Sequence, residues 1–121
     1  MVNILIISGN INSINHYRRF FTDEFKISAT NSADNAMNML ATKSADLVIF
    51  HAGADYGGLF GFYRKLRQNP AAAGLPLVMI TEASFVHALE DKVELQNAVV
   101  VGLDVRQEEL MEVVNSLLAD K

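Results

Sequence analysis

The sequence predicts an α/β fold in which a five-stranded parallel sheet lies between two layers of helices. An apolar, β-branched run over 47–50, which leads into a Gly-containing loop, is typical of a central strand buried on both faces. Other short apolar runs alternate along the chain with segments whose apolar residues recur every three or four positions. The length of 121 residues, of which 50% are hydrophobic, fits one globular domain spanning 1–121.

The first part of the chain predicts two strands and two helices before the central strand. The apolar run over 5–7 predicts a strand that stops at 8–10, and the alternation over 25–29 suits a strand near the sheet edge. The helix between them has an apolar stripe at Ile14, Tyr17, Phe20 and Phe21. A second helix, capped by Ser32, buries Ala33, Ala36, Met37 and Leu40.

The second part predicts three helices and two strands. Residues 55–58 are expected to be a loop, and the helix after it ends at Asn69-Pro70, because a residue before Pro is pushed out of the α region. Strands are expected over 77–81 and 98–101, separated by a helix capped by Ser84. That helix turns Phe85, Leu89 and Val93 inward. The last helix has a capping box over 104–107 and an apolar stripe at Leu110, Val113, Val114, Leu117 and Leu118.

Five strand–helix units joined by right-handed crossovers predict a doubly wound, flavodoxin-like sandwich with strand order 2-1-3-4-5. Ligands of such sheets bind beyond the carboxyl ends of the strands, where the winding reverses. His51 and the loop that follows it are therefore expected at the functional edge.

Composition excludes several classes of function. A formal net charge of −4 provides no surplus of Lys and Arg for binding nucleic acid. The apolar run near the N-terminus is too short to span a bilayer, so no membrane association is expected. The absence of Cys excludes thiolate metal sites and thiol nucleophiles, and it fits a cytoplasmic location.

Over essentially its whole length, the chain resembles the receiver domains of two-component response regulators, the CheY-like domains. Residues 46–51 look like the third strand of these domains. Residues 63–70 followed by 75–81, which end in Met-Ile-Thr, look like their third helix and fourth strand. Glu108-Glu109-Leu110 resembles the start of their last helix.

The resemblance implies that the phosphorylation pocket is degenerate. In a competent receiver, the first strand ends in two acidic Mg²⁺ ligands, and these positions are Ser8 and Gly9 here. The third strand of a competent receiver ends in the Asp that accepts the phosphoryl group, and this position is His51. Because Mg²⁺ prefers carboxylate and other oxygen ligands, the three residues predict a pseudo-receiver without a metal or other cofactor.

Three further pocket positions follow from the same resemblance. Thr81 retains the switch hydroxyl after the fourth strand. Leu103 occupies the position of the Lys that pairs with the phosphoryl oxygens, and Val100 that of the switch aromatic. The sequence offers no nucleophile paired with a base and no cofactor fingerprint, so no enzymatic activity is expected.

The resulting interpretation is a protein-interaction module of bacterial signalling that acts independently of aspartyl phosphorylation. Receivers bind effectors or a second copy through the face formed by their fourth helix, fifth strand and fifth helix. Here those segments are the helix after Ser84, the strand over 98–101 and the last helix. The candidate partner residues are His87, Asp91, Glu94, Arg106, Glu109 and Glu112.

Alternative interpretations remain open. The vacated pocket could bind a small anion, because helix N-termini point toward this edge. Asp55 or His51 could serve as a displaced phosphoryl acceptor. A zinc site formed by His16, His51 and His87 is also conceivable, although no local His-x-x-x-His spacing supports it.

Overall fold

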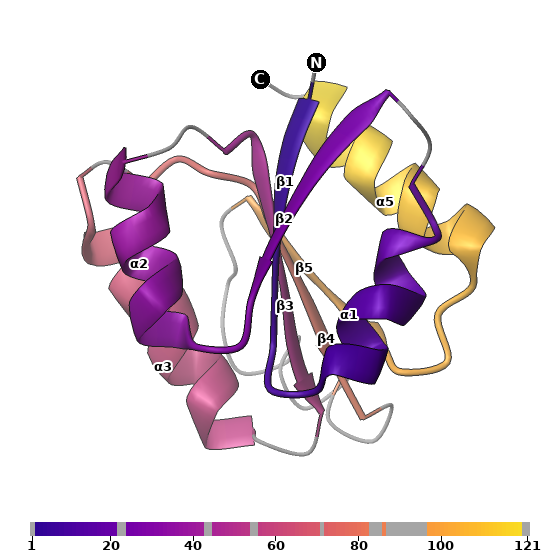
Figure 1. Cartoon of the computed structure of the whole chain (residues 1–121), viewed down its shortest axis with the longest axis horizontal. Helices are drawn as coiled ribbons and strands as arrows, with labels where there is room; N and C mark the ends of the chain where they lie inside the picture. Colours follow the sequence, from indigo (N-terminus) through magenta and orange to yellow (C-terminus); the bar gives the residue numbers. More distant parts are fainter. Residues whose placement is uncertain are drawn as a thin grey trace.

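The computed structural model describes residues 2–21, 24–42, 45–53, 56–70, 72–82, 86 and 97–119. Five parallel strands form one sheet in the order β2-β1-β3-β4-β5, which confirms the predicted topology (Figure 1). The strands are β1 Val2–Ser8, β2 Phe25–Thr30, β3 Leu47–Gly53, β4 Leu77–Thr81 and β5 Ala98–Gly102. As predicted, β3 is central and β2 lies at an edge.

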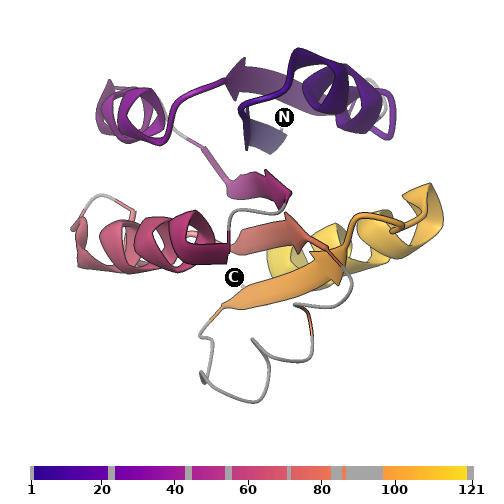
Figure 2. The ribbon, with the colours of Figure 1, turned by 90° about the horizontal axis from the view of Figure 1, so that it is seen from below.

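Helices cover both faces of the sheet. The described helices are α1 Ile11–Arg18, α2 Ala33–Thr42, α3 Tyr56–Gln68 and α5 Gln107–Ala119. Figure 2 shows α2 and α3 on one face and α1 and α5 on the other. The predicted helix capped by Ser84, with Phe85, Leu89 and Val93, lies outside the described residues.

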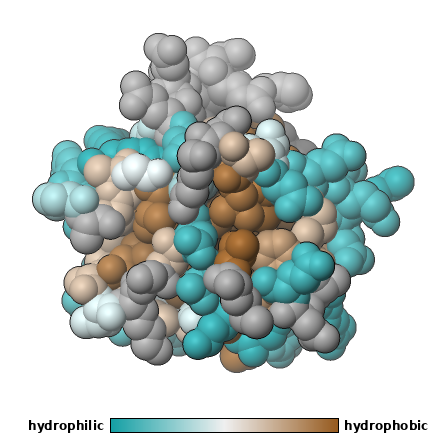
Figure 3. Space-filling view, turned by 90° about the horizontal axis from the view of Figure 1, so that it is seen from above, coloured by the Kyte–Doolittle hydropathy of each residue, from teal (hydrophilic) through white to brown (hydrophobic). Residues whose placement is uncertain are grey.

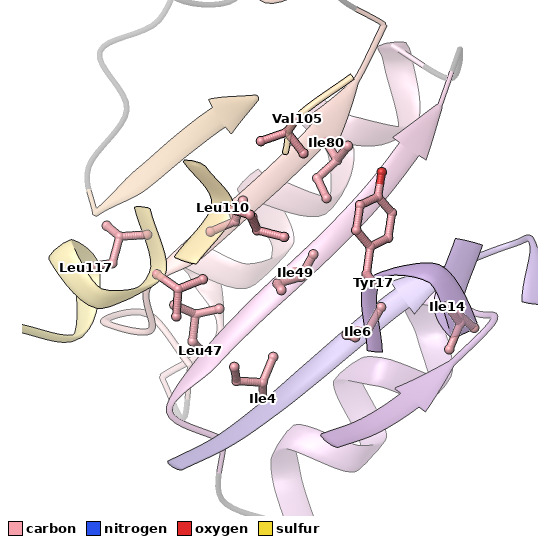
Figure 4. Close-up of a cluster of buried hydrophobic side chains, with 12 residues drawn as sticks. Ile4, Ile6, Ile14, Tyr17, Leu47, Ile49, Ile80, Val105, Leu110 and Leu117 are labelled. Carbon is pink, nitrogen blue, oxygen red and sulfur yellow. The ribbon is translucent and has the colours of Figure 1, made fainter. Parts of the chain in front are cut away.

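The core is divided in two by the sheet, because successive side chains of a strand point to opposite faces. Leu47 and Ile49 of β3 pack toward α1 and α5, whereas Val48 and Phe50 pack toward α2 and α3. Figure 4 shows the part of the core on the α1 and α5 side, in which Tyr17 of α1 and residues of α5 lie over the strands. Burying each large aliphatic side chain contributes about 1.5–3 kcal/mol.

Two helix boundaries at the ends of α1 and α3 differ from the prediction. The helix α1 ends at Arg18, and tight turns follow, in which Phe20 N–H donates to the Tyr17 carbonyl at 3.0 Å. The helix α3 begins at Tyr56, so the predicted loop over 56–58 is wrong. Packing of the apolar face of a helix outweighs the weak local preference of Gly for turns.

The capping box predicted over 104–107 is also wrong. The carbonyl of Arg106 accepts the backbone N–H of Leu110 at 2.9 Å, so α5 begins at Gln107. Val105 N–H donates to the carbonyl of Gly102 at 3.1 Å, which closes a turn after β5. Asp104 therefore belongs to this turn and is too early in the chain to cap the helix.

At the edge where the strands begin, Arg67 and Asn97 join two connections. Nη1 of Arg67 donates to the carbonyls of Ala73 and Leu75, at 3.2 and 2.9 Å, and Nη2 donates to the carbonyl of Asn97 at 3.2 Å. Asn97 has a positive φ of 55°, and its side-chain amide donates to the carbonyl of Gly74 at 2.9 Å. Figure 3 views this edge and shows apolar surface between two hydrophilic flanks.

Candidate functional site

The strand register gathers three predicted pocket residues at the carboxyl edge of the sheet. Ser8 at the end of β1 lies opposite His51 of β3. Thr81 at the end of β4 lies opposite Gly53 on one side and Gly102 on the other. The strand β3 continues two residues beyond His51, and its pairing with β4 is irregular between His51 and Gly53.

A hydrogen bond joins Ser8 and His51. The Ser8 Oγ lies 3.1 Å from Nδ1 of His51, accepts the Asn10 N–H at 3.1 Å and lies 3.3 Å from the Asn10 carbonyl. A hydroxyl has a single proton, so the tautomer of His51 decides whether that proton goes to Nδ1 or to the Asn10 carbonyl. Because Ser8 is only 1% exposed, its hydroxyl is held within these contacts.

His51 is half-buried and lies against Tyr17 of α1. The two ring centroids are 5.6 Å apart. Burial lowers the pKa of His51 below its ordinary value of 6.5; a backbone hydrogen bond opposes this shift, and the charge of His16 adds to it. His51 is therefore neutral at neutral pH.

Tyr17 lies in the core, as its helical spacing predicts, but nothing in the sequence indicates that its ring lies beside His51. Tyr17 is 3% exposed, and Figure 4 shows its hydroxyl pointing toward the carboxyl edge. Burial raises the pKa of the Tyr17 hydroxyl. The His16 ring packs edge-on against Tyr17 and Phe20, with centroid distances of 5.0 and 4.9 Å. The helical spacing of Ile14, Tyr17, Phe20 and Phe21 predicted a common face, but it did not identify the residue of β3 that this face covers.

The remaining predicted pocket positions have different environments. Thr81 is fully buried, and Val100 is buried in the core cluster on the α2 and α3 face. Gly9 is exposed, and a Cβ at this position would meet no atom within 4 Å. Leu103, at the position where the resemblance implies a Lys, is 41% exposed. Thr81 and Val100 are therefore buried, whereas Gly9 and Leu103 are exposed to solvent.

Ser8, Gly9 and His51 together do not form a site that fits Mg²⁺. This cation needs oxygen ligands in octahedral geometry, usually including carboxylates. The Ser8 hydroxyl is already hydrogen-bonded, Gly9 has no side chain, and His51 presents an imidazole nitrogen. Within the described ranges, no three His, Cys, Asp or Glu side chains form a metal-binding group. Asp55, one of the two candidate displaced acceptors, and His87, the third residue of the conceivable zinc site, lie outside those ranges.

The predicted partner face is described only in part. Arg106, Glu109 and Glu112 are exposed along the start and first turns of α5. A hollow of ≈ 360 Å³ between β5 and α5 is lined by residues that include Arg106 and Glu109. The other candidate residues, His87, Asp91 and Glu94, lie outside the described residues.

By sequence, the chain is similar to a curated protein. The "Probable transcriptional regulator ycf29" of Cyanophora paradoxa is 30% identical over 82 residues, which cover 67% of this chain and 39% of that protein. The chain thus spans about two fifths of the length of this curated relative. No protein-family model matches the chain.

Solved structures show the likeness over the whole domain. A response regulator receiver protein from Sinorhizobium medicae superposes with a TM-score of 0.76 at 19% identity, covering 98% of this chain and 94% of that one. The receiver domain of a signal transduction histidine kinase from Syntrophus aciditrophicus gives 0.81 at 16% identity, with coverages of 99% and 92%. The chemotaxis response regulator CheY4 of Vibrio cholerae gives 0.77 at 16% identity, with coverages of 97% and 98%.

These likenesses confirm, at the level of the fold, the resemblance found in the sequence. The five strands in the order 2-1-3-4-5 and the helices on both faces are those of the CheY-like, flavodoxin-like fold. None of the described helices has the length and hydropathy that crossing a membrane requires.

Proposed function

We propose that this chain, which has the fold of response-regulator receiver domains, is a signal-transduction module that binds protein partners without aspartyl phosphorylation. It is not itself an enzyme, and it acts in the cytoplasm, where the absence of Cys is compatible with a reducing compartment. The fold shared with receivers supports a role in signalling.

The hydrogen bond between Ser8 and His51 carries the proposal. Phosphoryl transfer to a receiver needs an acceptor carboxylate and a divalent cation that neutralises the developing charge. At the corresponding edge, this chain has a serine hydroxyl bound to a neutral, half-buried imidazole. That pair is internally satisfied and offers neither the acceptor carboxylate nor ligands for a hard cation.

A module of this kind receives its signal through binding. Without a phosphoryl group to bias two conformations, the output depends on the concentration of the partner and its affinity. The exposed charges of α5, Glu109 and Glu112, and the preceding Arg106, are the described part of the surface proposed to bind the partner.

The anion-sensor alternative is weaker on electrostatic grounds. An anion gains most from a cationic side chain, whereas burial favours the neutral form of His51. The Lys position of receivers is occupied by the apolar Leu103. Phosphorylation at a displaced residue, Asp55 or His51, remains an alternative that the following experiment tests directly.

Incubation with acetyl phosphate and Mg²⁺, followed by intact-mass measurement, tests the proposal. We expect no phosphoryl adduct, and titration with beryllofluoride should leave the backbone NMR signals near Ser8, His51 and Thr81 unchanged. A receiver with an intact acidic pocket, treated in parallel, is the positive control. A stoichiometric adduct would refute the proposal, and peptide mapping would then identify the acceptor.

A further inference from the structure

A furrow runs along the seam between β5 and α5. Two adjoining hollows of ≈ 360 and ≈ 430 Å³ share Val113 in their lining. Val101 lines the first and Val99 the second, and all three valines are half-buried. The furrow therefore has an apolar floor that the fold leaves partly exposed to water. Figure 2 shows β5 at the end of the sheet, with α5 beside it.

The rim of the furrow is acidic. Among the described residues that line it, Asp104, Glu109 and Glu112 are exposed carboxylates, and Arg106 is the one basic residue. None of these three carboxylates takes part in an ion pair with another residue of the described ranges. Among the residues that the structure describes, a single guanidinium in the furrow therefore balances their negative potential.

These charges argue against a second copy as the occupant. A symmetric pair would bring two such rims together, each with three carboxylates and one guanidinium, and the whole chain has a formal charge of −4. Like charges placed opposite one another in an interface disfavour association. A segment with positive charges flanking an apolar side chain matches both the rim and the floor.

We propose that the furrow between β5 and α5 binds a cationic segment of a partner protein, with an apolar side chain of that segment seated over Val99, Val101 and Val113. This inference rests on the proposed function, since it specifies the chemistry of the partner. Rim carboxylates contribute modestly to affinity and more strongly to the rate and selectivity of association.

A designed peptide provides the test. The probe is a short synthetic peptide with Lys residues on both sides of one Leu, and its control has Gln in place of each Lys. In ¹⁵N-labelled protein, the Lys peptide should shift the backbone signals of Val99, Val101 and Val113, and the Gln peptide should shift them much less. Added NaCl should weaken binding, because the rim charges are exposed.

Matched variants locate the binding site. The double variant Glu109→Gln/Glu112→Gln should weaken binding of the Lys peptide about three- to tenfold, since two exposed charge pairs are lost. Glu108→Gln, the same change at an exposed position of α5 that lines neither hollow, should weaken it less than about twofold. All three substituted side chains are exposed, so circular dichroism should show unchanged folding.

Several results would overturn the inference. These are equal binding by the double variant and by Glu108→Gln, equal binding of the Gln peptide, or shifts confined to other parts of the chain. Concentration-dependent dimerisation that shifts the same three valine signals would assign the furrow to a second copy instead. A phosphoryl adduct together with furrow binding would refute only the proposed function, whereas the absence of both would refute only the furrow.

Discussion

The Ser8 hydroxyl lies 3.1 Å from Nδ1 of His51, and this contact joins the carboxyl ends of two strands paired at the centre of the sheet. Both residues stand where a phosphorylatable receiver is expected to carry carboxylates. Under the proposed function, two neutral side chains that hydrogen-bond one another stand at positions where two carboxylates would repel. The contact gives each of the two side chains a hydrogen-bond partner within the protein.

Replacing Ser8 with Ala should destabilise the protein by about 1–3 kcal/mol, because Nδ1 of the half-buried His51 and the Asn10 N–H both lose a partner. Urea unfolding measures this loss. Ser116→Ala, at an exposed position of α5, should change the free energy of unfolding by less than about 0.5 kcal/mol. Equal effects of the two substitutions would show that the Ser8 contacts contribute nothing.

His51 should make stability depend on pH in mildly acidic solution. Its pKa is lowered in the folded protein, so the unfolded chain takes up the proton first. The contribution is complete above the unfolded pKa of about 6.5 and is lost as pH falls from there to the folded pKa. Urea unfolding should show a steeper loss of stability below pH 6.5 for the natural protein than for His51→Gln. His16 is present in both, so parallel curves would contradict the prediction.

Tyr17 should make the free energy of unfolding fall with rising pH in alkaline solution. Burial raises its pKa in the folded protein, so the unfolded chain loses the proton first. Stability should therefore fall as pH rises from about 10 toward the folded pKa. Tyr17→Phe removes this term while preserving the ring, so its stability should fall less over the same interval. Tyrosinate absorbance of the two folded proteins would show directly whether Tyr17 titrates late.

Replacing Arg67 with Lys should destabilise the protein measurably. An ammonium cannot reach the three carbonyls that the guanidinium joins, so Arg67→Lys should cost about 1–3 kcal/mol of stability. Arg64→Lys, at an exposed position of the same helix, is the matched control and should be nearly neutral. Chemical denaturation of both variants shows whether the shape of the Arg67 guanidinium or only its positive charge stabilises the protein. Equal stability of the two variants would contradict a role of the shape.

Two substitutions at Asn97 should separate the effect of backbone strain from the effect of the side-chain hydrogen bond. Its positive φ suits Gly, so Asn97→Gly should lose only the bond to the Gly74 carbonyl, about 1 kcal/mol. Asn97→Val should cost about 1–3 kcal/mol more, because a β-branched residue is strained at this φ. Equal losses for Gly and Val, measured by denaturation, would contradict the role of the backbone.

The strands and their order could be predicted because buried parallel strands have uninterrupted apolar runs and crossovers follow one hand. The central run over 47–50 was sufficient to place β3. The first residues of the helices were harder to predict from the sequence. Gly57 favours a turn by local preference, yet it lies in α3, which begins at Tyr56, because the helix propensity of a single residue is only a weak guide.

The candidate site could be predicted only along the strands. The resemblance placed Ser8 and His51 at one edge, and the register confirms that they are opposite each other. It could not reveal their hydrogen bond, since that depends on rotamers. The contact between Tyr17 and His51 depends on how α1 rotates over the sheet, which the periodicity of one helix does not determine.

The position of β3 at the centre of the sheet has a consequence for folding kinetics. Ser8 and His51 are separated by 43 residues along the chain, and β1 cannot gain its inner neighbour until β3 has been synthesised. Only β2 can pair with β1 earlier. Closing so long a loop costs entropy before any native contact offsets it, which slows folding relative to helical domains of similar size. Until β3 has emerged from the ribosome, β1 of the nascent chain can pair only with β2, and its other edge is exposed. The nascent chain is therefore prone to aggregation at this stage.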